Sequence, residues 1–179
     1  MDTLTQLAIK YKTDKWGKHN YTPVYYKLFE NKGKRRAVKK VLEIGTAEGA
    51  GVYMYRDFFT HATIYGAEVD PKRVEMMRGK DRIDVMLCDQ SKQIDLINLI
   101  RHTGADLDLV IDDGSHKPED QLFTCLQLCA GLKKGAVYVI EDVADESIVK
   151  PIKEFFKNSD VQVLKLSPRY DDRLIIITR

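Results

Sequence analysis

The sequence predicts an α/β fold, a doubly wound mixed sheet of seven strands that is mostly parallel and has an antiparallel last strand. Short apolar runs that stop at an acid or a glycine alternate with stretches of helical spacing. This alternation is typical of a parallel sheet with helices on both faces. The last two apolar runs are joined only by the short polar connector 167–172, which predicts an antiparallel pair. The 179 residues contain no repeat or Pro/Gly-rich linker, so we expect one globular core.

The individual elements follow from local signals in chain order. Two helices precede the first strand, and the turn-like segment 12–23 between them lacks core periodicity. Pro71 and Pro118 stand near the starts of two later helices, where proline is best tolerated, and Gly135 marks a turn. We expect strands at 39–45, 62–70, 83–89, 107–112, 136–142, 161–166 and 173–179, and helices at 2–11, 22–30, 50–59, 71–79, 91–101, 117–132 and 148–157.

The composition is that of a globular protein, with 44% hydrophobic and 31% charged residues. The formal net charge of +2 gives no reason to expect a nucleic-acid partner, and the basic run 31–40 is expected to be a solvated loop. No apolar run approaches the roughly 18 residues of a membrane helix, and the N-terminus is too polar for a secretory signal. Cys88, Cys125 and Cys129 lack the paired spacing of a zinc site. Cys125 and Cys129 are one helical turn apart in an apolar stripe, so we expect them to be buried free thiols, and we expect a cytoplasmic protein.

Ligands of an open parallel sheet bind outside the carboxyl ends of its strands, so the residues that follow the strands form the candidate site. The first strand ends at Glu43 and Gly45, and further glycines follow. A dinucleotide-binding fingerprint counted from Gly45 lacks its central glycine, because Ala47 stands there. An acid before such a loop suits a positively charged ligand better than a pyrophosphate. The glycine loop therefore argues against NAD.

The second and third strands end in polar residues that suit a nucleoside. Glu68 stands about 20 residues after the glycine loop, the spacing of a carboxylate that accepts hydrogen bonds from a ribose diol. Asp89 and Gln90 could bind the exocyclic amine of an adenine, although Asp89 could equally be a turn former. The sequence thus combines a glycine loop, an acid suited to bind a ribose and an acid suited to bind an adenine, and it lacks a phosphate-binding motif. This combination indicates S-adenosylmethionine (SAM).

Acids also follow the fourth and fifth strands. Asp112 and Asp113 precede His116, and Glu141 and Asp142 end the fifth strand. Adjacent strand ends would bring Asp113 near Asp142, and clustered carboxylates select Mg2+ or Ca2+. Such an ion would activate a substrate hydroxyl, and His116 would take its proton. Alternatively, Asp112 and Asp113 cap the helix that follows, and His116 is a surface residue. Spacing alone leaves both interpretations open.

Together these segments resemble the class I SAM-dependent methyltransferases. More narrowly, they are similar to the metal-dependent sugar O-methyltransferases of macrolide biosynthesis, of mycinamicin type, and to their cephalosporin-hydroxylase-like relatives. The most specific segment is TDKWGKHNYTPVYYKLF, and VLEIG, IYGAEVD, CDQS, VIDDGSH and GAVYVIED follow in the family's order. The resemblance covers nearly the whole chain. It implies a Rossmann-like fold in which residues 1–38 form a helical lid on a single methyltransferase domain, residues 39–179.

The resemblance also implies roles for individual residues. His116 and Asp113 would be the catalytic residues, with His116 as the general base. Cofactor contacts are implied for Thr13, Glu43, Gly45, Thr46, Glu68, Val69, Asp89, Gln90 and Asp112. Mg2+ ligands are implied at Asp113, Glu141 and Asp142. The segment 12–23 would close over cofactor and substrate through Thr13, Asp14, His19 and Tyr21.

The sequence departs from the family's pattern in its compressed first loop, GTAEGAGV, and we expect no counterpart of the family's large extra N-terminal region. Glu48 is the candidate stand-in for a metal ligand from that region. We therefore expect a SAM- and Mg2+-dependent O-methyltransferase that acts on a hydroxyl of a small molecule, a sugar or glycosylated natural product. We expect a homo-oligomer with no membrane or nucleic-acid partner. The alternatives are a non-catalytic SAM-binding domain and an NAD-binding domain of the same fold class.

Overall fold

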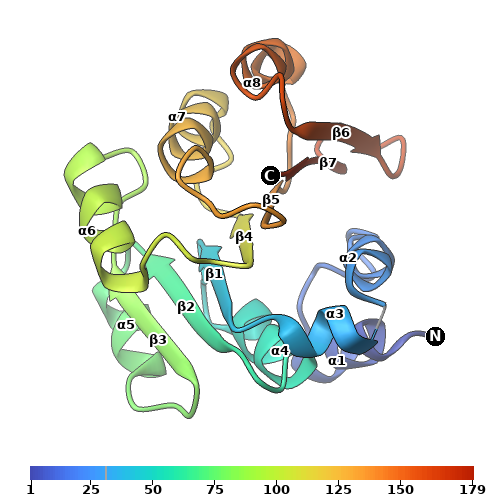
Figure 1. Ribbon diagram of the computed structural model, residues 1–179. Coiled ribbons are helices and arrows are strands. Elements are labelled where there is room, and N and C mark those ends of the chain that lie inside the picture. The colour runs from blue at the N-terminus through green and yellow to red at the C-terminus, as the bar shows by residue number, and fades with distance from the viewer. Residues whose placement is uncertain (31) are drawn as a thin grey trace.

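The computed structural model describes residues 1–30 and 32–179 and contains a seven-stranded mixed sheet (Figure 1). The strand order is β3-β2-β1-β4-β5-β7-β6. The first five strands run parallel, and β7 is antiparallel to both of its neighbours. The predicted fold class is therefore confirmed. The strands are β1 (Lys40–Ile44), β2 (Thr63–Glu68), β3 (Ile83–Leu87), β4 (Leu109–Asp112), β5 (Val137–Ile140), β6 (Asp160–Lys165) and β7 (Arg173–Thr178).

Helices occupy every stretch where the sequence predicts one, with ends that differ by a few residues. No helix in the described part of the chain is long and apolar enough to cross a bilayer. The helices are α1 (Thr3–Tyr11), α2 (Thr22–Phe29), α3 (Lys32–Ala37), α4 (Ala50–Phe58), α5 (Pro71–Met77), α6 (Gln93–Thr103), α7 (Pro118–Cys129) and α8 (Val149–Phe155), with a short 3-10 turn at Glu146–Ile148.

The basic run 31–40 is the one stretch whose predicted structure is wrong. It forms the short helix α3, followed by β1, instead of a solvated loop. Lysine and arginine have unbranched side chains that lose little freedom in a helix, so an exposed basic run can be helical without an apolar face. Asn31, the first residue of the run, lies outside the described residues.

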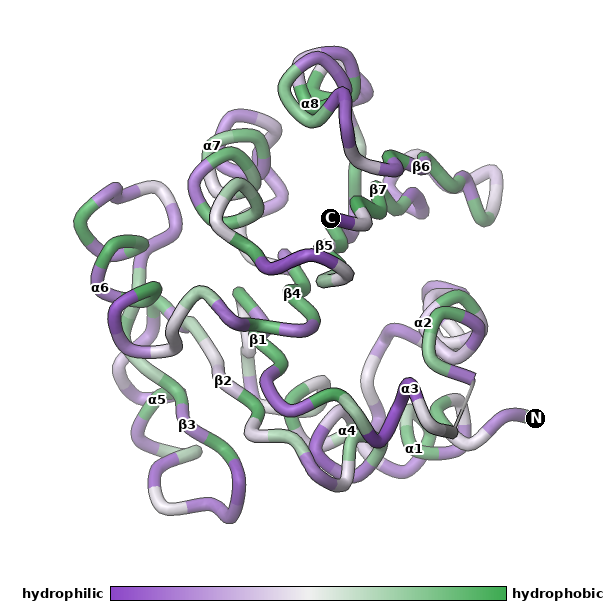
Figure 2. Tube along the Cα trace, in the orientation of Figure 1, coloured by the Kyte–Doolittle hydropathy of each residue, from purple (hydrophilic) through white to green (hydrophobic). Residues whose placement is uncertain are grey.

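Two apolar cores lie on opposite faces of the sheet, and the strands carry most of the hydrophobic colour at the centre of Figure 2. Side chains of α1, α2, α4 and α5 form one core with the sheet, and those of α6, α7 and α8 form the other. Leu4, Tyr25 and Phe29 belong to the first core, so the N-terminal helices share it with the strands. The buried free thiols Cys125 and Cys129 belong to the second, as expected.

The candidate site lies where the chain leaves β1 and β4, the neighbouring strands at which the sheet order reverses. From β1 the chain passes to α4 in the first core, and from β4 it passes to α7 in the second. The two loops therefore diverge and leave a crevice between them, as expected for a doubly wound sheet. Gly45 and Asp113, the first residues after these strands, are in contact: an added Cβ on Gly45 would lie 2.1 Å from the Asp113 carbonyl oxygen.

Candidate active site

A cleft of about 620 Å³ runs along the carboxyl ends of the parallel strands. It collects residues from the loops after β1, β2, β3, β4 and β5, as the sequence predicts for a doubly wound sheet. The predicted site residues that line it are Gly45, Glu68, Val69, Asp89, Gln90, Asp113, His116 and Asp142. Those that lie behind its walls are Thr13, Glu43, Thr46, Asp112 and Glu141.

Glu68 links the ends of β1 and β2 at one end of the cleft. Its carboxylate accepts hydrogen bonds from the backbone N–H groups of Ala47 at 2.8 Å, Val69 at 2.9 Å and Asp70 at 3.0 Å. The hydroxyl of the buried Thr46 lies 3.4 Å from the same carboxylate. Glu68 therefore fixes the glycine loop while still facing the cleft. This is the position that a ribose-binding acid requires.

A buried polar network sets the position of Gln90. Its carboxamide donates to Asp112 Oδ1 at 3.0 Å and accepts from the Ser115 backbone N–H at 2.7 Å. Asp112 is fully buried and also accepts from the Tyr138 hydroxyl at 3.2 Å. Burial raises the pKa of Asp112 to about 7. Asp112 thus contacts Gln90 from behind the cleft wall instead of facing the cleft.

The helix-capping alternative for the two aspartates is not what the structure shows. Helix α7 has Lys117 as its N-cap and no side-chain cap hydrogen bond. By contrast, the turn-forming role considered for Asp89 is present, because its Oδ1 accepts from the Ser91 N–H at 3.1 Å and hydroxyl at 2.7 Å. Asp89 also lines the cleft, so a turn role and a ligand-facing position coexist.

Two carboxylates and an imidazole converge at the other end of the cleft. Ligand atoms of Asp113, His116 and Asp142 lie within 4.8 Å of one another. His116 and Asp142 have φ angles of 57° and 51°, in the left-handed region that non-glycine residues rarely adopt. Such strain persists only where the surrounding structure holds it, and it gathers at functional sites. The His116 side chain is exposed to solvent.

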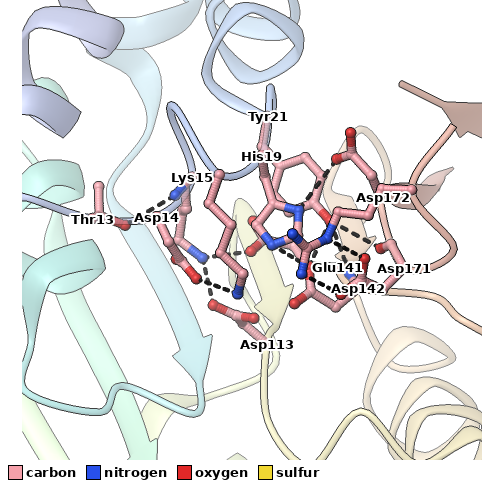
Figure 3. Close-up of polar contacts among 12 residues, drawn as sticks. Thr13, Asp14, Lys15, His19, Tyr21, Asp113, Glu141, Asp142, Asp171 and Asp172 are labelled. Carbon is pink, nitrogen blue, oxygen red and sulfur yellow. Dashed lines mark hydrogen bonds and ion pairs between the residues drawn. The ribbon is translucent and has the colours of Figure 1, made fainter. Parts of the chain in front are cut away.

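The segment between α1 and α2 contributes a residue that the sequence did not single out. Lys15 is 2% exposed, and its Nζ lies 2.6 Å from Asp113 Oδ2 and 2.5 Å from Glu141 Oε2 (Figure 3). Glu43 Oε1 lies 3.4 Å away. Burial disfavours the charged amine, but Asp113 and Glu141 outweigh it and raise the pKa of Lys15 well above its ordinary value. One lysine in a polar turn carries no pattern that marks it as buried.

Glu43 and Glu141 face Lys15 and not the cleft. Burial raises the pKa of Glu43 to about 7, although Lys15 opposes the shift. Burial also raises the pKa of Glu141 well above its ordinary value, against the same opposing charge. The Tyr25 hydroxyl donates to Glu141 Oε1 at 2.5 Å. The structure thus directs Glu141, expected at the metal site, into the interior. Glu43 lies between Lys15 and Gly51, where an added Cβ would lie 2.2 Å from Glu43 Oε1.

Asp142 is held by the same N-terminal segment. The Tyr21 hydroxyl donates to Asp142 Oδ1 at 2.5 Å, and His19 Nε2 lies 3.6 Å from that oxygen. The His19 ring stacks on Tyr21, and its Nδ1 lies 3.2 Å from Asp172 Oδ1. His19 and Tyr21 therefore contact an acid of the site from behind. Asp14 from this segment does line the cleft.

A second grouping of possible metal ligands overlaps the first. Ligand atoms of His19, Asp142 and Asp171 lie within 4.8 Å of one another. The Arg169 guanidinium, however, occupies both oxygens of Asp171, at 2.5 and 3.2 Å. In the group formed with Asp113 and His116, Lys15 contacts only Oδ2 of Asp113, and all three members line the cleft, so this group is the better candidate. Glu48, the possible stand-in, pairs with Arg73 on the surface and is not part of either group.

No family model matches the chain. It is 33% identical over 147 residues to the 8-demethyl-8-alpha-L-rhamnosyl tetracenomycin-C 2'-O-methyltransferase of Streptomyces olivaceus, a match over 78% of this chain and 37% of that protein. It is also 33% identical over 148 residues to the demethylmacrocin O-methyltransferase of Streptomyces fradiae, a match over 78% of this chain and 36% of that enzyme. The chain therefore spans about a third of the length of these relatives.

Among solved structures, the chain is similar to MycE, a methyltransferase from the mycinamycin biosynthetic pathway that was determined in complex with Mg and S-adenosylhomocysteine (SAH). The TM-score is 0.79 at 26% identity, and the match covers 99% of this chain and 54% of MycE. The chain is thus a homologue of natural-product O-methyltransferases and has their Rossmann-like fold.

Proposed function

We propose that the chain is a SAM-dependent O-methyltransferase that acts on a hydroxyl of a small molecule, with a sugar or glycosylated natural product as the acceptor class. The observation that carries the proposal is the single cleft that joins a ribose-type acid, Glu68, to the group of Asp113, His116 and Asp142. The names of the relatives and the ligands of MycE support the same chemistry.

The cofactor would lie along the loops after β1, β2 and β3. Glu68 would accept the ribose hydroxyls, and Asp89 with Gln90 would meet the adenine edge. Gly45 lets the backbone approach the ligand, because its φ of +80° and its contact with Asp113 exclude a side chain. When bound, SAM supplies the methyl group that the acceptor oxygen attacks. This arrangement would accelerate methyl transfer mainly by holding the acceptor oxygen and the methyl group of the cofactor in line in one cleft.

The ligand atoms at the acidic end of the cleft are of the kind that a divalent cation binds. Asp113 and Asp142 supply the hard oxygen atoms that Mg2+ prefers, and they lie close enough to share one ion. When bound, Mg2+ would lower the pKa of the acceptor hydroxyl. His116 would accept the hydroxyl proton, and its exposed ring could pass that proton to solvent. Glu141 is not part of this set, because Lys15 and Tyr25 occupy its oxygens.

The proposed function is tested by calorimetric titration of the metal-free protein with SAH, repeated with Mg2+ and with NAD as the control ligand. We expect binding of SAH and none of NAD. Methyl transfer from SAM to a panel of sugars and glycosides then defines the acceptor. A protein that binds NAD and ignores SAH would contradict the proposal.

The general base is tested by His116→Ala. Because His116 belongs to the Asp113–Asp142 group and not to the residues proposed to bind the cofactor, turnover should fall by about 10²–10⁴-fold while SAH affinity stays the same. His61→Ala is the matched control, since His61 is an exposed histidine that precedes β2, at the amino end of the strands. Equal turnover of the two variants would exclude His116 as the base.

A further inference from the structure

The Lys15 ammonium lies among carboxylates from three neighbouring strands. Glu43 belongs to β1, Asp113 follows β4, and Glu141 follows β5, and all three lie within 3.4 Å of Lys15 Nζ. These contacts bridge 98 residues to Asp113 and 126 residues to Glu141. Behind the cleft, the ammonium thus contacts the carboxyl groups of Glu43, Asp113 and Glu141, which we call the inner end of the acidic cluster.

This inner end holds more carboxyl groups than cations. Three carboxylates face one ammonium, and Glu43 Oε2 is buried with no hydrogen-bond partner among the described residues. Glu43 and Glu141 are each 1% exposed, so water does not screen them well. A buried carboxyl group is ionised only beside a cation and is otherwise protonated. The inner end therefore has hard oxygen donors that a divalent ion could bind in their ionised form.

Asp113 connects this inner end to the cleft. Its Oδ2 contacts Lys15, and the same carboxylate belongs to the group with His116 and Asp142. Mg2+ and Mn2+ bind carboxylate oxygens at about 2.1 Å, so an ion placed between Asp113 and Glu141 would need the space that the ammonium occupies. Lys15 and a metal ion therefore compete for the inner oxygens, and two cations at such a distance repel one another.

We propose that Lys15 is a positioning residue, a built-in cation that excludes divalent metal from Glu43 and Glu141 and restricts it to Asp113 and Asp142 at the cleft. The inference rests on the proposed function only in assuming that the ion at Asp113 and Asp142 activates the acceptor hydroxyl. The exclusion itself is a property of the buried cluster. It accounts for a fully buried lysine in a polar turn and for the inward direction of Glu141.

The test compares three variants of the whole chain. Lys15→Met removes the charge but keeps an unbranched apolar stem, and Lys15→Arg keeps the charge. Lys10→Met is the matched control, because Lys10 lies in the same N-terminal part but is 58% exposed in a surface ion pair with Asp57. Mn2+ binding is measured by calorimetry, and thermal melting is recorded with and without Mn2+.

Lys15→Met should bind Mn2+ at least about tenfold more tightly than the unmodified chain or bind one additional ion, because a repelling charge is lost and inner oxygens are freed. Its melting temperature should also rise more on addition of Mn2+. Lys15→Arg and Lys10→Met should match the unmodified chain. A Lys15 that served only as a structural ion pair would give the opposite sign, since a loosened site binds metal more weakly. Unchanged or weaker binding by Lys15→Met overturns the proposal, and so does Mn2+ binding by Lys15→Arg that is as tight as binding by Lys15→Met.

Should Lys15→Met not fold by itself, circular dichroism with added Mn2+ gives the answer. Recovery of the native spectrum supports the proposal, because the ion then replaces the ammonium, and a chain that stays unfolded with Mn2+ overturns it. SAH titration is recorded separately. Failure of the unmodified chain to bind SAH would count against the proposed function, whereas the Mn2+ comparison does not depend on SAH.

Discussion

Asp112 and Asp113 are neighbours in the sequence but have different environments. Asp112 is fully buried and accepts hydrogen bonds from Gln90 and Tyr138, whereas Asp113 is 21% exposed and lines the cleft. Successive side chains of an extended segment point in opposite directions, which explains the division. Sequence spacing left a helix-capping role open for both acids, and the family resemblance made them candidate site residues. Only the structure separates the one that faces the cleft from the one that positions Gln90.

A prediction at this scale concerns Gly114. An added Cβ would lie 1.7 Å from Gln90 Oε1, the acceptor of the Ser115 N–H. Gly114→Ala should therefore displace the Gln90 carboxamide and weaken SAH binding by about tenfold, the equivalent of one lost hydrogen bond of about 1.4 kcal/mol. Gly131→Ala is the control, because its nearest atom lies 4.0 Å away and its φ is not in the left-handed region. Calorimetric titration with SAH measures the affinities of both variants. Equal affinities of Gly114→Ala and Gly131→Ala would show that Gln90 does not contribute to SAH binding.

At the scale of elements, the N-terminal helices are part of the core. Leu4 on α1 and Tyr25 on α2 belong to the same apolar cluster as β1 and β4. The hydroxyls of Thr5 and Thr22, both buried, lie 2.7 Å apart and join the two helices. A lid at 1–38 remains a prediction, but this packing favours one cooperative unit in which the helices position the 12–23 segment.

Leu4→Ala tests that cooperativity. Leu4 is fully buried, so the substitution should lower the free energy of unfolding by about 2–5 kcal/mol and shift a single transition. Ile9→Ala on the same helix is the control, because Ile9 is 52% exposed and its loss should change stability by less than about 0.5 kcal/mol. Urea unfolding monitored by circular dichroism and by Trp16 fluorescence measures both. A separate early transition in Leu4→Ala would instead show that the N-terminal part unfolds independently.

At the scale of the whole molecule, buried acids determine how stability depends on pH. Burial raises the pKa of Glu43 and of Asp112 to about 7, against ordinary values of 4.5 and 3.8. Between about pH 4.5 and 7 the folded metal-free chain therefore binds more protons than the unfolded chain. Its stability should fall as pH rises through this window, by on the order of 1 kcal/mol per pH unit for each group. Carboxylates with a lowered pKa, such as Asp57, contribute in the opposite sense only below about pH 4.

Urea unfolding of the metal-free chain at several pH values between 5 and 8 measures this trend. Glu43→Gln should flatten it, because the amide mimics the protonated acid and no longer titrates. Glu48→Gln is the control, since Glu48 is 68% exposed and pairs only at the surface. Stability that increases from pH 5 to 7 in the unmodified chain would contradict the prediction.

The sequence by itself determined the fold class, the order of the strands and helices along the chain, and the acids that meet at one edge of the sheet. These features follow from local signals, namely the period of the apolar residues and the turn residues. Parallel connections then bring the carboxyl ends of the parallel strands to the same edge of the sheet. Only the tertiary structure decided which of those acids face the cleft. The deciding contact, Lys15 with Asp113 and Glu141, joins residues 98 and 126 positions apart and depends on how α1 and α2 pack against the sheet. No local pattern encodes such a contact, because it forms only when the core has closed around a buried charge.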